Sequence, residues 1–356
     1  MSARKNSTLF YKDKPLFGLD IGYNRVKVMQ IETNKSNHEI IGYGAMPFDP
    51  ALIDKGVITD PNMLAGQLSE FLKKDVTGVI NAKRVVIAIP ADHTFIRSVV
   101  LPVAAAKDLD NAIRLEVEQY IPMPVSEMNI DYNVIRQTDK EVQILVVAVS
   151  KVVAESYVAV GEAMGLEVVA LEPSFTAVTR LFSQLDKADL PTVLIDIGAI
   201  SSDVIVYDGG VITAGTVPGG GDTLTDDVSK KLRISTEESV FIKVKYGVGP
   251  GYKQKDVRAA AAAQLKQIVQ EVERIKRYYE EHLEGKTIGQ VIITGGGSNL
   301  LGINDYLTEA LRAPARSFIP WQKLTFRNIN PPPDIDNMIY VTVGGLAMLT
   351  SQEIFS

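Results

Sequence analysis

One strand–turn–strand pattern occurs twice in the chain and limits the possible folds more than any other feature. GLDIGYNRVKVMQI (Gly18–Ile31) and LIDIGAISSDVIVYDGG (Leu194–Gly210) share an apolar strand, the tripeptide Asp-Ile-Gly, a short polar turn and a second apolar strand. The two copies lie far apart in a sequence of 356 residues, which is long enough for two domains. We therefore predict a duplicated α/β domain with one such hairpin in each half.

A third glycine-rich turn follows in VIITGGGSNLLGINDYL (Val291–Leu307), where a β-branched strand leads into three glycines and a helix. A single Asp-Ile-Gly is weak evidence, because Asp and Gly are common in ordinary hairpins. Two copies with a triple glycine are stronger evidence, since glycine lets the main chain approach an anion and a carboxylate can hold hydrated Mg²⁺. The pattern predicts a nucleoside triphosphate between two facing hairpins, with the glycine-rich helix start as a third contact.

Composition excludes several kinds of chemistry. The chain has no cysteine, which excludes disulfides, thiol nucleophiles and cysteine-based zinc sites, and its histidines, His38, His93 and His282, lack ligand spacing. A net charge of −6 argues against a nucleic-acid partner. The longest apolar runs, Val85–Pro90 and Ile144–Val149, are too short to span a bilayer, and the N-terminus lacks the apolar region of a secretory signal. We therefore expect a cytoplasmic protein.

Apolar periodicity, prolines and glycines indicate alternating strands and helices. Besides the two hairpins and the glycine-rich turn, we expect strands at Val85–Ile89, Phe95–Leu101, Asn129–Arg136 and Val142–Val149. Helices are expected at Val57–Leu72, Leu109–Tyr120, Lys151–Met164, Leu171–Leu185, Ala259–Leu283 and within Met338–Leu349. Residues Lys83–Leu166 form a compact αβ pattern of their own, which predicts an inserted subdomain.

The three glycine-containing segments together resemble the phosphate-one, phosphate-two and adenosine motifs of the actin-like ATPase superfamily. Within that superfamily, QYIPMPVSEMNIDYNV (Gln119–Val134), EVERIKRYYEE (Glu271–Glu281) and the extended adenosine motif resemble the PilM family, the cytoplasmic actin-like component of type IV pilus assembly. The resemblance runs from about Leu16 to Met348 and implies two related domains around a nucleotide cleft. The insert resembles subdomain IC, shared by PilM and the division protein FtsA.

The resemblance also implies a division of the chain into subdomains. A flexible N-terminus would cover residues 1–14, and the insert IC would cover residues 83–166. Subdomain IA would comprise residues 15–82, 167–190 and 335–356, subdomain IIA residues 191–228 and 286–334, and subdomain IIB residues 229–285.

By the same resemblance, a set of residues would bind Mg·ATP. Asp20 and Asp196 would face and hold Mg²⁺. The phosphates would be surrounded by Gly22, Asn24, Lys27, Gly198, Ser201, Ser202 and Asp203, with Gly219, Gly220, Gly221 and Asp222 as a further phosphate or ribose turn. Lys243 would lie beside the ribose, although Val240 stands where relatives often have an acidic residue. The adenosine motif would contribute Gly295, Gly296, Gly297 and Ser298.

Catalysis is a separate question. In hydrolysing members of the superfamily, a polar residue at the start of the helix after the insert orients the attacking water, and Glu172 in LEPSFTAVTR resembles it. The alternative is that Glu172 caps its helix. Because nucleotide in the PilM group stabilises a conformation, we expect hydrolysis to be slow or absent.

The resemblance finally implies a function and partners. In PilM relatives, the groove between the insert and the first domain captures the cytoplasmic N-terminal peptide of the bitopic membrane protein PilN. We therefore expect an ATP-binding adaptor, peripheral on the inner membrane, that links the alignment complex to the platform protein and motor ATPases. The segment Tyr120-Ile121-Pro122 belongs either to that groove or to an internal plug. Two alternatives are a small-molecule kinase and an FtsA-like filament-forming ATPase, although the C-terminal tail lacks the amphipathic helix expected of FtsA.

Overall fold

A computed structural model describes residues 14–34, 37–121, 123–186, 189–249, 255–283, 285–334, 336–350 and 353. The predicted flexible N-terminus, apart from Lys14, lies outside these residues, as do Pro122 and most of the tail after residue 350. No helix in the described part of the chain is both long and apolar enough to cross a membrane.

A seven-stranded sheet forms the first half of the molecule. Its strand order is β11-β7-β1-β2-β3-β17, and β6 pairs with β3. The strands are β1 (Leu16–Ile21), β2 (Arg25–Asn34), β3 (Asn37–Pro47), β6 (Thr77–Gly78), β7 (Arg84–Ile89), β11 (Glu167–Pro173) and β17 (Thr325–Phe326). A separate two-stranded sheet joins β4 (Ile53–Asp54) to β5 (Val57–Ile58).

A five-stranded sheet forms the second half, in the order β14-β13-β12-β15-β16. Its strands are β12 (Thr192–Ile197), β13 (Ser201–Tyr207), β14 (Val211–Pro218), β15 (Gln290–Thr294) and β16 (Ala315–Ser317). In each half a hairpin, β1–β2 or β12–β13, is followed by a third antiparallel strand, and the first hairpin strand pairs in parallel with β7 or β15. The sequence repeat is therefore a repeat of sheet topology.

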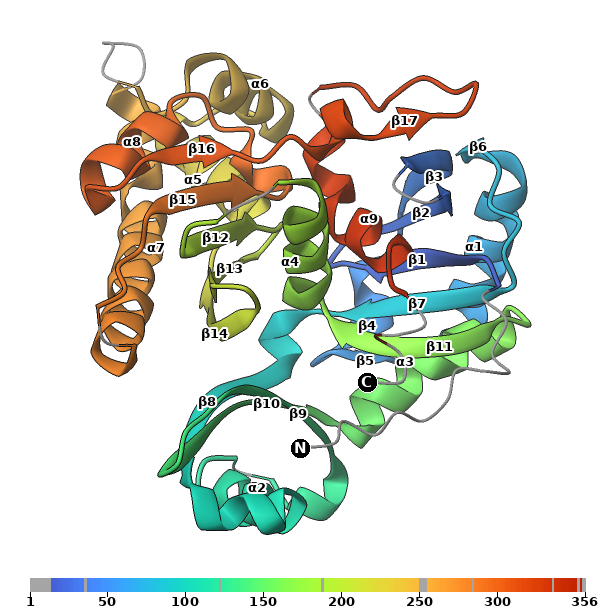
Figure 1. The fold of residues 1–356 in the computed structure, drawn as a ribbon. Coiled ribbons are helices and arrows are strands. Elements are labelled where there is room, and N and C mark those ends of the chain that lie inside the picture. The colour runs from blue at the N-terminus through green and yellow to red at the C-terminus, as the bar shows by residue number, and fades with distance from the viewer. Residues whose placement is uncertain are drawn as a thin grey trace.

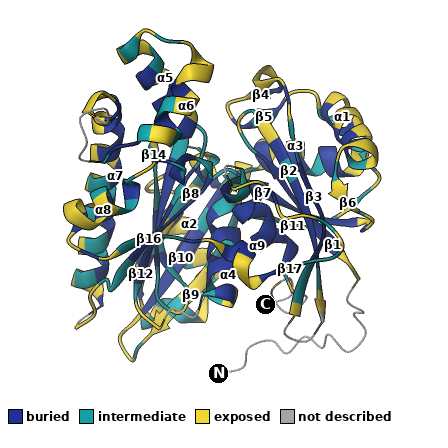
Figure 2. Ribbon diagram, turned by 90° about the horizontal axis from the view of Figure 1, so that it is seen from above, coloured by how far each residue is buried: buried dark blue, intermediate teal, exposed yellow. Residues whose placement is uncertain are grey.

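Helices cover both sheets (Figure 1). In the first half these are α1 (Pro61–Lys74), α3 (Lys151–Ala163), α4 (Ser174–Leu185) and α9 (Val341–Ala347), and in the second α5 (Gly221–Leu232), α6 (Thr236–Tyr246), α7 (Lys255–His282) and α8 (Ile303–Leu311). Helices α4 and α9 lie between the two sheets, where buried residues join the halves (Figures 1 and 2). Their axes approach so closely that a Cβ on Gly345 would lie 1.8 Å from the carbonyl oxygen of Ala177.

The inserted unit is narrower than the predicted range 83–166. A three-stranded sheet of β8 (Thr94–Pro102), β10 (Glu141–Ser150) and β9 (Met128–Gln137) packs against α2 (Leu109–Val117) around a core of its own. Strand β7 pairs with β1, and α3 contributes Val153, Tyr157 and Val160 to the core of the first half. Both elements therefore belong to the first half, and the separate unit, seen below it in Figure 1, runs from β8 to β10.

Three predicted helices begin later than their apolar pattern suggests. The predicted helix Val57–Leu72 starts at Pro61, after the Asp60 carboxylate caps it by accepting from the Met63 N–H at 2.9 Å. Residues 171–173 end β11, because they pair in parallel with β7, and α4 starts only after Pro173. The C-terminal helix starts at Val341, after a 3₁₀ turn at Asn337–Tyr340.

Candidate functional site

A cleft of roughly 580 Å³ opens between the two halves, and both hairpins face it. All but four of the predicted ligand residues line it. These lining residues are Asp20, Gly22, Asn24, Lys27, Asp196, Gly198, Ser201, Asp203, Gly221, Asp222, Lys243, Gly295, Gly296 and Gly297. The fold therefore brings together three sequence segments that the motifs had singled out independently.

The two hairpins close in the same way. The N–H of Gly22 donates to the carbonyl oxygen of Arg25 at 3.1 Å, and the N–H of Gly198 donates to Ser201 at 2.9 Å. In the first hairpin, the ammonium of Lys27 forms a 2.7 Å ion pair with the Asp20 carboxylate. This pair places one positive and one negative group, both largely buried, at the floor of the cleft.

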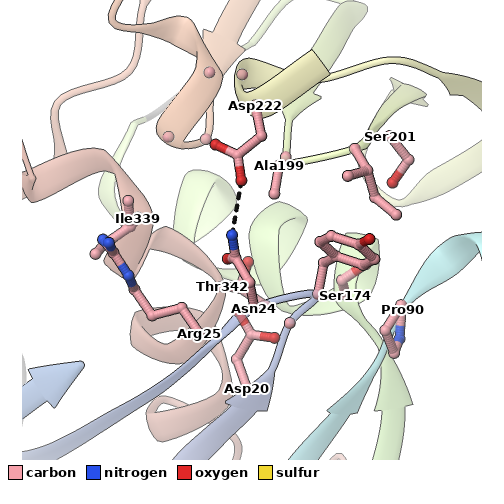
Figure 3. A pocket seen from close by; sticks show the side chains of 18 of the residues that line it. Asp20, Asn24, Arg25, Pro90, Ser174, Ala199, Ser201, Asp222, Ile339 and Thr342 are labelled. Atoms are coloured by element: carbon pink, nitrogen blue, oxygen red, sulfur yellow. Dashed lines mark hydrogen bonds between the residues drawn. The ribbon is translucent and has the colours of Figure 1, made fainter. Parts of the chain in front are cut away.

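A hydrogen bond between Asn24 and Asp222 joins the two sides of the cleft. The side-chain amide of Asn24, at the tip of the first hairpin, donates to the Asp222 carboxylate in the first turn of α5 at 2.8 Å (Figure 3). The bond links residues from opposite halves. It therefore reports directly how far the halves are closed.

The second hairpin carries two carboxylates with perturbed acidity. Asp196 and Asp203 are direct partners across the antiparallel pair β12–β13. Burial, together with the charge of Asp20, raises the pKa of Asp196 to about 6. Burial and the charge of Asp196 raise the pKa of Asp203 to about 7, although Thr216 and Ser174 donate hydrogen bonds to it at 2.7 and 3.3 Å. Negative charge concentrated in this way favours a cation beside it.

Glycines from three elements meet beside the second hairpin. A Cβ on Gly297 would lie 2.9 Å from the N atom of Gly221, and one on Gly220 would lie 2.4 Å from the carbonyl oxygen of Gly198. Gly295 has a φ of +83°, and its Cβ would lie 2.2 Å from the Asp196 carboxylate. Side chains at these positions would fill the space where the three turns meet, so the glycines keep bare main chain facing the cleft.

The four predicted residues that do not line the cleft, Ser202, Gly219, Gly220 and Ser298, support these turns. The hydroxyl of Ser202 donates to the carbonyl oxygen of Gly219, and the hydroxyl of Ser298 donates to Gly295, each at 2.7 Å. The carbonyl oxygen of Gly220 accepts from the Gln264 amide on α7 at 3.1 Å. Their contribution to the site is to hold main chain in position.

Lys243 reaches the cleft from α6. Its buried ammonium donates to the carbonyl oxygen of Gly221 at 2.7 Å and to the Thr225 hydroxyl at 2.8 Å. Burial lowers the pKa of Lys243, and the charge of Asp222 partly offsets that effect. The lysine thus fixes the start of α5 next to the cleft.

Glu172 does not line the cleft. Arg180 donates to both of its carboxylate oxygens at 2.7 Å, and the Thr176 hydroxyl donates a third hydrogen bond at 2.9 Å. The same guanidinium donates to Gly345 and Glu353, so it ties β11 and α4 to the C-terminal segment. This geometry favours an anchoring role over water positioning. The helix-cap alternative also lacks support, because Pro173 occupies the N-cap position of α4 and no side chain caps the helix.

Several polar residues of the cleft were missed from the sequence, and three of them lie near the predicted site residues. Ser174 begins α4, Asp92 lies in the 3₁₀ turn Ala91–His93 after β7, and Tyr157 comes from α3. For Ser174 the sequence did contain a signal, because the segment LEPSFTAVTR after the insert was identified. The residue chosen in that segment, Glu172, lies two positions before Ser174. Asp92 follows the end of a buried strand parallel to β1, where side chains reach the same edge of the sheet as Asp20.

Two topologically equivalent sheets, joined by α4 and α9 and facing one cleft through equivalent hairpins, define the actin-like ATPase fold. The inserted three-stranded unit distinguishes a smaller group of proteins within this fold. The chain belongs to the family "Type IV pilus assembly protein PilM", whose model matches residues 18–351.

Curated relatives and solved structures agree with this fold. The chain is 25% identical to the cell division protein FtsA of Bacillus subtilis over 351 residues, covering 85% of this chain and 78% of that protein. It is 27% identical to FtsA of Neisseria meningitidis over 163 residues, and that match spans 38% of each protein.

Among solved structures, a PilM–PilN type IV pilus biogenesis complex matches with a TM-score of 0.78 at 22% identity, covering 94% of this chain and 97% of that one. MreB5 of Spiroplasma citri bound to AMPPNP matches with a TM-score of 0.53 at 13% identity, over 94% and 95% of the two chains.

Proposed function

We propose that this chain is a nucleotide-binding adaptor of type IV pilus assembly that binds Mg·ATP in the cleft and a membrane protein's cytoplasmic tail beside the insert. The observation that carries the nucleotide part is the convergence of both hairpins and the glycine turn on one cleft. An actin-like relative of the same fold was solved with AMPPNP, which supports a nucleotide as the ligand class.

The side chains present suit a hydrated magnesium ion with phosphates. No group of three or more potential metal-ligating side chains occurs in the described part of the chain, so a closed protein cage is not available there. Asp20 and Asp196 would instead hold Mg²⁺ through its own waters, the arrangement that this ion prefers. Lys27, Asn24 and the bare glycine main chain would surround the phosphates, and Lys243 with the 295–298 turn would face the nucleoside.

We propose slow or absent hydrolysis for this adaptor. The predicted water-positioning carboxylate, Glu172, is held by Arg180 and Thr176 outside the cleft. A small-molecule kinase is the alternative, and detection of a phosphorylated metabolite would favour it.

The proposed partner is the cytoplasmic N-terminal peptide of a PilN-like bitopic protein. Family membership and the likeness to a PilM–PilN complex support this choice. The insert would provide the docking groove with the first half, and Lys151 on α3 already contacts it by donating to the carbonyl oxygen of Ser126 at 2.7 Å. Bound in this way, the chain would lie on the inner face of the cytoplasmic membrane and connect the alignment complex to the platform and motor ATPases.

Isothermal calorimetry with a synthetic PilN N-terminal peptide tests the adaptor proposal. The full chain should bind the peptide with a stoichiometry near one, in the presence or absence of Mg·ATP, and a scrambled peptide of the same composition should give no heat. Absence of binding in both conditions would remove the adaptor function.

A further inference from the structure

Tyr157 combines a buried ring with an unpaired hydroxyl at the cleft. Its side chain is among the largest fully buried ones, and the ring packs in the core of the first half together with Val153 and Val160. The residue nevertheless lines the cleft. Its hydroxyl has no hydrogen-bond partner in the described part of the chain.

An unpaired buried hydroxyl needs an explanation. Burying a polar group without a partner opposes folding, and most such groups in proteins are satisfied by protein or ordered water. A phenylalanine would fill the same core space without this penalty. The presence of the hydroxyl therefore implies a partner on a ligand that approaches it from the cleft.

The charged residues near the hydroxyl show which part of the cleft Tyr157 lies beside. Burial, followed by the negative charges of Asp20 and Asp92, raises the pKa of Tyr157 well above its usual value. Both carboxylates line the cleft, and neither accepts a hydrogen bond from the tyrosine. Tyr157 therefore lies within range of the charges of Asp20 in β1 and Asp92 after β7, on the side of the cleft that the first half forms.

We infer that the Tyr157 hydroxyl binds a coordinated water of the divalent cation that accompanies a nucleotide in the cleft. The inference rests on the proposed nucleotide function and deepens it. Mg²⁺ keeps several of its waters in proteins, and each of those waters donates hydrogen bonds to acceptors around it. The phenol oxygen would accept one of them, and Asp20 and Asp92 would accept others. The phenol proton remains available to a neighbouring carboxylate or phosphate oxygen.

Tyr157→Phe tests this role because it removes one oxygen and keeps the ring in the core. ATP affinity of the full chain is measured by calorimetry in excess Mg²⁺ and again in EDTA, together with the thermal midpoint without ligand. We expect roughly fivefold weaker binding of Mg·ATP, unchanged binding of ATP in EDTA, and an unliganded midpoint equal to or above that of the wild type.

Tyr279→Phe is the matched control. That tyrosine is also fully buried, but its hydroxyl donates to Asp208 at 3.0 Å and the residue does not line the cleft. The control should lower the thermal midpoint and leave ATP affinity unchanged.

Equal Mg·ATP affinity in wild type and Tyr157→Phe would overturn the inference while leaving the nucleotide function in place. An equal loss with and without Mg²⁺ would also overturn it, because the contact would then be to phosphate. No binding by the wild-type chain would remove the proposed nucleotide function, and this inference with it.

Discussion

Asn24 and Asp222 are 198 residues apart in the sequence, yet the amide of one donates a 2.8 Å hydrogen bond to the carboxylate of the other across the cleft. Asn24 lies two residues after Gly22 in the first half, and Asp222 directly follows Gly221 in the second half. A ligand between the hairpins would compete for the same two side chains. The bond is therefore suited to hold the halves close when no ligand occupies the cleft.

Asn24→Ala should loosen this contact with little effect on global stability. Because the bond is exposed, we expect a change in unfolding free energy below about 1 kcal/mol. Amide hydrogen exchange should become faster in the first turn of α5. Asn304→Ala, which removes an amide–Ser317 contact within the second half, should leave α5 exchange unchanged. Unchanged α5 exchange in Asn24→Ala would contradict a closing role.

Asp203→Asn should stabilise the unliganded protein in a pH-dependent manner. The raised pKa of Asp203, about 7, means that the folded state binds a proton more tightly than the unfolded chain does. The charged carboxylate therefore costs stability that grows between about pH 4 and pH 7 and is fully present above that range. The variant should exceed the wild type in unfolding free energy by on the order of 4 kcal/mol at pH 8, with a difference that vanishes below about pH 4.

Thermal unfolding in EDTA across this pH range measures the effect of Asp203→Asn. The exposed Asp139→Asn change in the β9–β10 turn is the control, and it should leave the free energy of unfolding close to that of the wild type. A stability difference for Asp203→Asn that does not change with pH would show that its carboxylate is not perturbed by burial.

Glu172→Gln distinguishes anchoring from catalysis. Both partners of the Glu172–Arg180 pair are largely buried, so leaving the guanidinium without its full counter-charge should cost on the order of 2 kcal/mol. ATP affinity should not change, because Glu172 lies outside the cleft. Glu70→Gln, in the exposed pair with Lys74, should cost far less. Normal stability with a lost ATPase rate would instead support water positioning.

Lys243→Met should weaken ATP binding by roughly tenfold, because it removes a buried ammonium that holds the start of α5 beside the cleft. Equilibrium titration with a fluorescent ATP analogue measures the change. Lys245→Met, two residues further along α6 and exposed, is the control and should bind like the wild type. Equal affinity in the two variants would remove Lys243 from the site.

The sequence predicted the repeat well because each hairpin is encoded locally. Asp20 and Asp196 each precede Ile-Gly in the same strand context, and strand alternation then fixes which side chains face the cleft. The strand order of both sheets follows from that repeat and from the parallel strands β7 and β15. The insert was drawn too wide because β7 and α3 are local neighbours of the insert, and only their long-range pairing with β1 and α1 assigns them to the first half.

Residues whose role depends on distant partners could not be found in the same way. Glu172 was selected from its position before a helix, whereas its partner Arg180 lies two turns further along that helix. Tyr157 gave no signal, because an aromatic residue on the apolar face of a helix is ordinary core. Only the packing of α3 beneath the cleft brings the residue to the lining of the cleft.

Calorimetric titration of the full chain with Mg·ATP, compared with Asp20→Asn, tests most directly whether the cleft is a nucleotide site. The account predicts one site per chain in the wild type and at least roughly tenfold weaker binding in the variant. Both titrations are run well below the thermal midpoint of the variant, which should be lower than that of the wild type because the largely buried ion pair with Lys27 is lost. No heat from the wild-type chain, or equal affinity in both proteins, would contradict it.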